Sequence, residues 1–206
     1  MHNKITTVVF DLGNVLIDHN PEYLFLNEFN GNQEKTDWFL NNVCTSEWNL
    51  GQDAGRTIEE ANRLKIEEFP EYQKQILMYY GRWEEMCKGP IEGTVSIFEA
   101  LKKTKQYKLY ALTNFSSELL PIADKMFPYL NTFDGRVVSA EEKEIKPFDK
   151  IYQILLKRFD IDAKTAVFID DKLENIEAAI RNGMQGIHFK SSEQLATDLK
   201  KLGINY

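Results

Sequence analysis

The chain has 206 residues, of which 43% are hydrophobic, and a formal net charge of −7, so it can bury the core of one domain with an insertion or of two small domains. An acidic chain without a basic stripe argues against nucleic acid as the main partner, and no apolar run approaches the roughly 20 residues of a membrane-spanning helix. The N-terminal MHNKITT lacks the apolar region of a signal peptide, and Cys44 and Cys87 have no metal-binding spacing, so we expect free thiols in a reducing cytoplasm.

The first predicted element is a buried strand that ends at a carboxylate. Residues 5–10, ITTVVF, are mostly β-branched or aromatic, and Asp11 follows them directly. Gly13 lies two residues later, and the apolar pattern then resumes in VLI. This pattern is typical of a strand that brings a carboxylate to the edge of a sheet, with a tight loop beside it. Such a carboxylate can attack an electrophile, bind a metal ion, or do both.

The next segment, residues 20–87, is predicted to be mostly helical. Helical patterns occur in PEYLFLNEF, EKTDWFLNNV, TIEEANRLKIEEF and EYQKQILMYYGRWEEM. The aromatic residues Trp38, Trp48 and the pair Tyr79-Tyr80 are expected to form the core of this segment. The sequence GQDAGR at 51–56 is expected to be a polar turn between the earlier and later helices.

Strand-like runs then alternate with helical patterns to the end of the chain. KLYAL at 108–112 precedes Thr113-Asn114, and AVFI at 166–169 precedes Asp170-Asp171. Shorter runs lie at 137–138 and 186–189, and helical spacing of apolar residues occurs at 151–159 and 173–180. Alternation of this kind predicts an α/β fold with a parallel sheet covered by helices on both faces. Sheets of this kind bind ligands beyond the carboxyl ends of their strands.

Four short motifs in this order resemble those of the haloacid dehalogenase superfamily. They are FDLGNVL with Asp11, Thr113-Asn114 after KLYAL, Lys146-Pro147 before IYQILL, and VFIDDKLENI with Asp170 and Asp171. The resemblance covers nearly the whole chain. It implies a Rossmann-like core at 1–19 and 88–206, with an inserted helical cap at 20–87.

The resemblance also implies a chemical role for each motif residue. Asp11 would attack phosphorus and form an aspartyl-phosphate, and Lys146 would neutralise the phosphoryl group and steady Asp11. Thr113, through its hydroxyl, and Asn114, through its backbone N–H, would hold the transferring oxygens. Mg²⁺ would be bound by Asp11, the carbonyl of Gly13 and Asp171, with Asp170 close by. Asn175 would face the same crevice.

Two positions depart from the pattern of the superfamily. Its phosphatases usually carry a second aspartate two residues after the nucleophile, as general acid and base, and here that position is Gly13. Relatives commonly have glycine three residues before the motif lysine, and here that position is Lys143. The first departure matters more, because general acid–base catalysis typically contributes about 10²–10⁴ in rate.

Three functions are compatible with the missing acid. The first is a phosphatase for esters with good leaving groups, with the acid dispensable or supplied by water, substrate or another residue; the DLGNV form resembles a branch that includes a bacterial sugar-1-phosphate phosphatase. The second is a 2-haloacid dehalogenase, which uses the aspartate on carbon and needs no metal. The third is a binding protein with low turnover.

The acidic pair at 170–171 favours the phosphatase. Three carboxylates in one crevice without a cation would raise one another's pKa, so they indicate magnesium and therefore phosphate. We expect a cytoplasmic magnesium-dependent hydrolase acting on a small phosphorylated metabolite, with neither nucleic acid nor a membrane as partner. Arg56 is a candidate for contact with the substrate, with a solvated surface position as the competing interpretation. The sequence leaves the substrate and the oligomeric state open.

Overall fold

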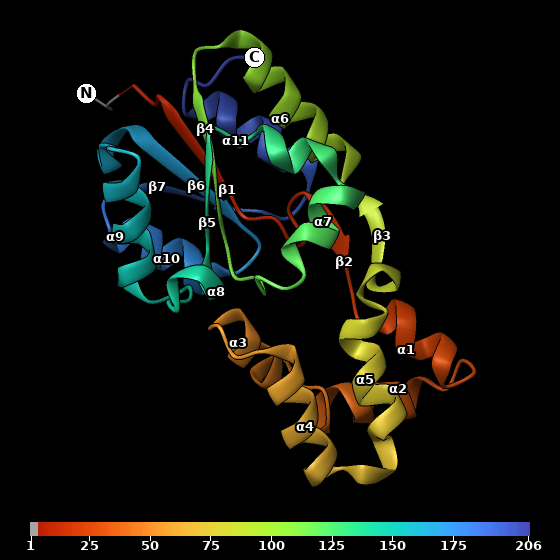
Figure 1. Cartoon of the computed structure of the whole chain (residues 1–206). Coiled ribbons are helices and arrows are strands. Elements are labelled where there is room, and N and C mark those ends of the chain that lie inside the picture. The colour runs from red at the N-terminus through yellow and green to blue at the C-terminus, as the bar shows by residue number, and fades with distance from the viewer. Residues whose placement is uncertain (1–3) are drawn as a thin grey trace.

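The computed structural model describes residues 4–206 and is built around a five-stranded sheet of order β5-β4-β1-β6-β7 (Figure 1). All four strand pairs are parallel, which confirms the predicted α/β class. Residues 1–3, which belong to the predicted core and to the N-terminal sequence without signal-peptide features, lie outside the described residues. The strands are β1 (Thr7–Phe10), β4 (Lys108–Thr113), β5 (Gly135–Val138), β6 (Ala166–Asp170) and β7 (Gln185–His188).

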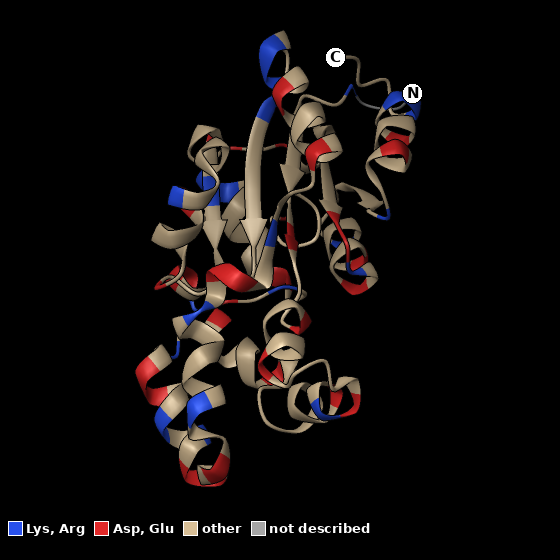
Figure 2. Cartoon of the chain, turned by 90° about the vertical axis from the view of Figure 1, so that its right-hand side faces the viewer, with Lys and Arg blue, Asp and Glu red and all other residues tan. Residues whose placement is uncertain are grey.

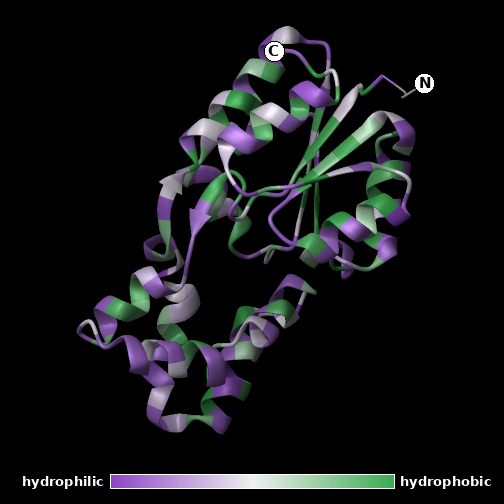
Figure 3. Cartoon of the chain, turned by 180° about the vertical axis from the view of Figure 1, so that it is seen from behind, coloured by the Kyte–Doolittle hydropathy of each residue, from purple (hydrophilic) through white to green (hydrophobic). Residues whose placement is uncertain are grey.

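Side chains of the central strand β1 alternate between two separate hydrophobic cores. Val8 and Phe10 belong to one cluster, together with residues of α6 (Glu92–Thr104) and α11 (Ser192–Lys201). Val9 belongs to the other cluster, together with residues of α9 (Asp149–Arg158) and α10 (Leu173–Arg181). This alternation is the period of two that a strand imposes on its side chains. Because both faces are covered, the central strands are hydrophobic along their length, as Figure 3 shows.

Four shorter helical elements complete the core. They connect strands or lie beside their ends, and they are α7 (Leu120–Met126), η3 (Pro128–Thr132), α8 (Ser139–Glu142) and η4 (Ala163–Thr165). The short helix α8 follows β5 directly and lies at the carboxyl end of the sheet.

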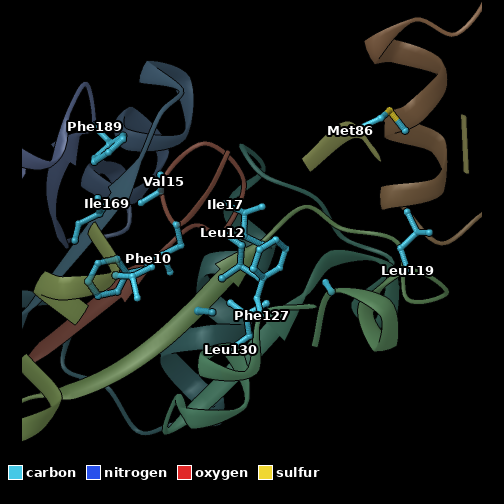
Figure 4. Close-up of a cluster of buried hydrophobic side chains, with 14 of the residues drawn as sticks. Phe10, Leu12, Val15, Ile17, Met86, Leu119, Phe127, Leu130, Ile169 and Phe189 are labelled. Atoms are coloured by element: carbon cyan, nitrogen blue, oxygen red, sulfur yellow. The ribbon is translucent and has the colours of Figure 1, made fainter. Parts of the chain in front are cut away.

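The loop after β1 is fixed by its apolar side chains. Leu12, Val15 and Ile17 are at most 1% exposed and pack in the cluster drawn in Figure 4. Strand β2 (Ile17–His19) then pairs antiparallel with β3 (Cys87–Pro90). These two short strands, which the sequence analysis did not predict, are the two connections between the sheet-containing core and residues 20–87.

Residues 20–87, the helical segment, form a separate layer below the carboxyl ends of the strands (Figure 1). Its elements are α1 (Glu22–Glu28), α2 (Gln33–Asn42), α3 (Ser46–Asp53), α4 (Ile58–Glu68), η1 (Pro70–Tyr72), α5 (Gln73–Gly81) and η2 (Trp83–Met86). Trp48, Tyr79 and Tyr80 are buried against one another, with ring centroids 5.0–5.3 Å apart, as predicted for core aromatics. The prediction was wrong for Trp38, which is 44% exposed because it lies on the outer side of α2 against Tyr72.

The prediction of a polar turn at 51–56 was also wrong over its first half. Gly51, Gln52 and Asp53 form the last turn of α3, and only Ala54 and Gly55 turn the chain. Thr45 caps this helix by accepting a hydrogen bond from the backbone N–H of Trp48 at 3.0 Å. Gln52 is buried and donates to the Tyr80 hydroxyl at 2.6 Å, so tertiary contacts stabilise a turn that contains glycine.

Both cysteines are free thiols; Cys44 is buried and Cys87 is half-buried. Basic and acidic residues are interspersed over the core and the helical segment in the view of Figure 2. Among residues 4–206, no helix has the length and apolar character needed to cross a membrane.

Candidate active site

Three neighbouring strands bring chemically competent side chains to one edge of the sheet. Asp11 follows β1, Thr113 ends β4, and Asp170 ends β6. The strands are in register, and the backbone N–H of Asp11 donates to the carbonyl of Ile169 at 2.9 Å. The parallel pairing therefore places residues that are about 100 and 160 positions apart in the sequence side by side.

Lys146 connects the carboxylates of Asp11 and Asp170. Its Nζ lies 2.9 Å from Asp11 Oδ1 and 2.7 Å from Asp170 Oδ2, and the residue is 3% exposed. The Asn114 side chain holds the backbone of Lys146 from both sides, accepting from its N–H at 2.8 Å and donating to its carbonyl at 3.0 Å. Asn114 thus fixes the lysine through two neutral hydrogen bonds, in addition to any role of its backbone N–H.

Asp170 and Asp171 differ in their surroundings although they are adjacent. Asp170 is fully buried, and its carboxylate accepts hydrogen bonds from Lys146, the backbone N–H of Lys172 at 2.8 Å, and the Asn175 side chain at 2.9 and 3.0 Å. Asp171 is half-buried and lines a cavity. Asp170 is therefore a fixed anchor of the cluster, whereas Asp171 faces the space where a ligand can enter.

The electrostatics of the cluster are dominated by burial and by excess negative charge. Burial raises the pKa of Asp11; Lys146 opposes this effect and Asp170 adds to it. Burial and the neighbouring Asp170 likewise raise the pKa of Asp171. For Lys146, burial lowers the pKa but the two carboxylates more than offset it, so its pKa is raised and the ammonium form is favoured.

These residues have the chemistry of a site for a hard cation. Asp11, Asp170 and Asp171 each offer an oxygen, and the three oxygens lie within 4.8 Å of one another. Lys146 pairs with two of these carboxylates and Lys172 acts on Asp171 at longer range, so two lysines face three carboxylates and the cluster carries excess negative charge. Asn175, which also lines the cavity, has a buried Oδ1 with no hydrogen-bond donor among residues 4–206. The donor set and this unpaired acceptor fit a divalent cation with oxygen ligands.

A cavity of about 510 Å³ lies between the cluster and the helical segment. The core side is lined by all the predicted motif residues except the fully enclosed Asp170: Asp11, Gly13, Thr113, Asn114, Lys146, Asp171 and Asn175. The structure thus brings these predicted residues to one place. It also adds residues from β2 and the helical segment that sequence reasoning missed, chiefly His19, Asn49, Asp53, Tyr79 and Trp83.

Asp53, His19 and Tyr79 are the titratable groups among these additions with strongly shifted pKa values, and burial raises the pKa of Tyr79. Burial raises the pKa of Asp53 to about 7, with Lys172 opposing the effect. Burial lowers the pKa of His19 to about 4, with Asp18 opposing it, and the imidazole stacks on Trp83 with ring centroids 5.7 Å apart. The Thr45 cap was the sequence signal that could have revealed α3 and hence Asp53, but Gly51 and Gly55 concealed it.

Arg56 and Lys143 have structural surroundings of their own. Arg56 is outside the cavity lining; its guanidinium donates to the Trp48 carbonyl at 2.9 Å and to Gln52 Oε1 at 2.8 Å. Arg56 therefore binds the C-terminal turn of α3. Neither of the two predicted positions, in contact with the substrate or freely solvated on the surface, agrees with this arrangement. Lys143 ends α8 in the left-handed conformation with φ of 56°, which explains why glycine suits this position.

Comparison with known proteins identifies the class to which this fold and cluster belong. Residues 5–183 match the haloacid dehalogenase-like hydrolase family, and the chain belongs to that family.

Two curated proteins are similar to about half of the chain. The chain is 33% identical to a sesquiterpene phosphatase of Aspergillus oryzae, over 56% of this chain and 59% of the relative. It is 29% identical to flavin mononucleotide hydrolase 1 of Arabidopsis thaliana, over 56% of this chain and 46% of the relative. The matched region therefore spans about half the length of these curated relatives.

A solved structure covers much more of the chain. A haloacid dehalogenase family enzyme of Bacteroides thetaiotaomicron, in complex with magnesium and inorganic phosphate, superposes with a TM-score of 0.70. It is 25% identical, over 91% of this chain and 95% of that one.

Proposed function

We propose that this protein is a magnesium-dependent phosphohydrolase that acts on a small phosphomonoester through an aspartyl-phosphate on Asp11. The observation that carries the proposal is the convergence of Asp11, Asp170 and Asp171 within 4.8 Å, where Lys146 is the one lysine among the described residues that forms an ion pair with them. A dianionic phosphate cannot approach such a cluster unless a cation offsets its charge. A dehalogenase acting on carbon has no need of the third carboxylate.

Magnesium would be held by Asp11, the backbone carbonyl of Gly13 and Asp171, with Asp170 behind them. The Gly13 carbonyl accepts no hydrogen bond from the described residues, which leaves it available as a ligand. When bound, the ion would offset the charge of the phosphoryl oxygens and so allow a carboxylate to approach phosphorus. The Bacteroides relative, solved with magnesium and inorganic phosphate, supports this choice of cation.

The remaining residues would position the reacting groups. The Asp11 carboxylate would attack phosphorus in line, while Lys146 holds its Oδ1 and adds positive charge beside the phosphoryl group. The Thr113 hydroxyl and the backbone N–H of Asn114 would donate to the transferring oxygens. Water would then hydrolyse the aspartyl-phosphate and release inorganic phosphate.

The helical segment at 20–87 would serve as a cap that covers the site and selects the substrate. The cavity lies between it and the core, and its residues Asn49, Asp53 and Tyr79 face the space left for the leaving group. A sugar 1-phosphate is one candidate substrate, because its anomeric oxygen leaves more readily than a simple alkoxide. The curated relatives, named for a sesquiterpene substrate and for flavin mononucleotide, make an isoprenoid phosphate and a flavin phosphate the other esters to test.

The test is phosphate release from a panel of phosphomonoesters, with and without magnesium, beside halide release from 2-chloropropionate. We expect magnesium-dependent phosphate release that Asp11→Asn abolishes. Asp37→Asn, which changes an exposed aspartate of α2, is the matched control and should retain full activity. Halide release without metal, or full phosphatase activity of Asp11→Asn, would contradict the proposal.

A further inference from the structure

The position of Gly13 leaves a chemical role unfilled in the proposed phosphatase. A Cβ added at Gly13 would meet no atom within 4 Å, so the space where a second carboxylate could stand is open. An ester of an ordinary alcohol releases an alkoxide, which needs a proton as the O–P bond breaks. Another group lining the cavity can supply that proton.

Most other ionisable groups of the helical side have properties that do not suit this role. Burial holds His19 in the neutral form, and its Nε2 is enclosed without a hydrogen-bond partner among the described residues. Burial raises the pKa of Tyr79 far above neutrality, so its hydroxyl cannot exchange a proton readily in both directions. Asp18 accepts a hydrogen bond from the Tyr23 hydroxyl at 2.8 Å, and among the described residues no hydrogen bond links it to the loop after β4.

Asp53 is held against the phosphate side of the cavity by a hydroxyl bridge. Ser139 Oγ donates to the Asp53 carbonyl at 2.6 Å and accepts from the backbone N–H of Phe115 at 2.9 Å. Phe115 directly follows the Thr113-Asn114 pair, so one serine hydroxyl ties the end of α3 to the loop proposed to hold the phosphoryl oxygens. Glycine at position 55 permits this close approach of the two segments, because a Cβ there would lie only 3.0 Å from the Ala140 carbonyl oxygen.

The side chain of Asp53 is positioned as well as its backbone. The Asn49 side chain, one helical turn earlier on α3, donates to Asp53 Oδ2 at 3.1 Å, and both residues line the cavity. This bond uses one carboxyl oxygen, and no other hydrogen bond to the Asp53 carboxyl group occurs among the described residues. Asp11 lines the same cavity from the opposite, core side.

We propose that Asp53, supplied by the helical segment, is the general acid and base that replaces the carboxylate missing at Gly13. The assignment rests on the phosphohydrolase function proposed above. It also gives the helical segment a chemical role besides coverage of the site, because the acid reaches the reacting ester only while α3 is docked on the core.

Asp53 alone can account for the proton transfers in both half-reactions. In the first, an Asp11 oxygen bonds to phosphorus, the ester O–P bond breaks, and the Asp53 proton passes to the leaving alkoxide. In the second, the Asp53 carboxylate takes a proton from water as its oxygen bonds to phosphorus. The bond from Asp11 to phosphorus then breaks, inorganic phosphate leaves, and Asp53 is protonated again.

The charges around Asp53 suit a group that both gives and takes a proton near neutral pH. Burial and the Asp11 carboxylate raise its pKa, Lys172 and Lys146 lower it, and the result is about 7. From α5, Tyr79 stays neutral near this pH, because burial raises its own pKa. A pKa near the working pH is the condition under which general acid–base catalysis is most efficient.

The experiment compares Asp53→Asn with the wild type on two esters in magnesium. One is 4-nitrophenyl phosphate, whose phenolate leaves without protonation, and the other is a primary alkyl phosphate. We expect a loss of about 10²–10⁴ in kcat/KM, which reports the first half-reaction, on the alkyl ester and less than about tenfold on the aryl ester. Hydrolysis of the aspartyl-phosphate is common to both esters, so kcat should fall on both. The basic limb of the pH profile on the alkyl ester should also disappear, and Asp53→Glu should recover part of the rate.

Two controls distinguish the loss of the general acid from misfolding of the variant and from failure of the proposed function. Glu47→Gln removes an exposed carboxylate from the same helix and should leave both rates unchanged. Activity of Asp53→Asn on the aryl ester shows that the site is still assembled. Equal losses of kcat/KM on both esters, or no loss of kcat/KM on either, would overturn the role of Asp53. A wild type that releases phosphate from no ester would refute the proposed function, and this assignment with it.

Discussion

Replacing Lys146 by methionine tests whether this lysine is what allows the carboxylates to share one site. Its Nζ lies 2.7–2.9 Å from Asp170 and Asp11, and all three side chains are buried. Methionine has a similar length but no charge, so Lys146→Met leaves the carboxylates without their counter-charge. Two unit charges 4.8 Å apart, the limit of separation in this cluster, repel by about 3 kcal/mol at an effective dielectric constant of 20.

The expected loss in the free energy of unfolding is about 3–5 kcal/mol at pH 8, the range found when one partner of a buried ion pair is removed. Lys146 lowers the pKa of Asp11, so its removal raises that pKa further. The variant should therefore recover stability as the pH falls and the carboxyl group becomes protonated, while the wild type recovers less.

The assay is urea unfolding with a chelator present, between pH 5 and pH 8. Lys150→Met, four residues later and with a side chain that is 67% exposed, is the control and should change the free energy of unfolding by less than about 0.5 kcal/mol. The double variant Lys146→Met/Asp170→Asn should regain part of the loss, because one of the repelling charges is gone. A stability of Lys146→Met at pH 8 equal to that of the wild type would refute the reasoning.

Three further changes have expected outcomes of their own. Asp171→Asn should raise the magnesium concentration needed for half-maximal phosphate release by roughly tenfold or more, and an unchanged titration would place the ion elsewhere. His19→Phe keeps the stack on Trp83 but removes a group whose pKa falls from 6.5 to about 4 on folding. The neutral imidazole contributes to stability above pH 6.5, and this contribution is lost as the pH falls toward 4. Between pH 8 and pH 5, the free energy of unfolding of the wild type should therefore fall by about 2 kcal/mol more than that of the variant. Parallel pH profiles would contradict this. Lys143→Gly relieves a left-handed conformation with φ of 56° and should raise the free energy of unfolding by about 0.5–1 kcal/mol in the same assay, whereas a decrease would mean that the lysine side chain has a compensating contact.

The strands and their chemical ends could be predicted from sequence because both signals are local. A run of β-branched and aromatic residues such as VVF before Asp11 indicates burial on both faces of a parallel sheet. The positions of Asp11, Thr113 and Asp170 at strand ends follow from where each run stops. That these ends lie at one edge follows from the general rule for parallel sheets, and the motif order supplied the family.

The tertiary structure decided what each carboxylate in the cluster contacts. Nothing in the local sequence distinguishes Asp170 from Asp171, yet one accepts hydrogen bonds from Lys146, Lys172 and Asn175, and the other lines the cavity. The role of the Asn114 side chain in fixing the backbone of Lys146 is likewise a contact across 32 positions. Such contacts depend on the packing of separate elements and leave no local periodicity.

The limit of sequence reasoning is clearest at α3. Local propensity at Gly51-Gln52-Asp53 favours a turn, and the helix persists there because Gln52 is bonded to Tyr80 and the carbonyl of Asp53 to Ser139. Local sequence patterns were enough to predict the α/β class, the strand ends that carry the core site residues, and the helical nature of most of the inserted segment. Only the tertiary structure placed Asp53 in the cavity that Asp11 lines, because free energy from long-range hydrogen bonds and packing overrode the local preference of the chain.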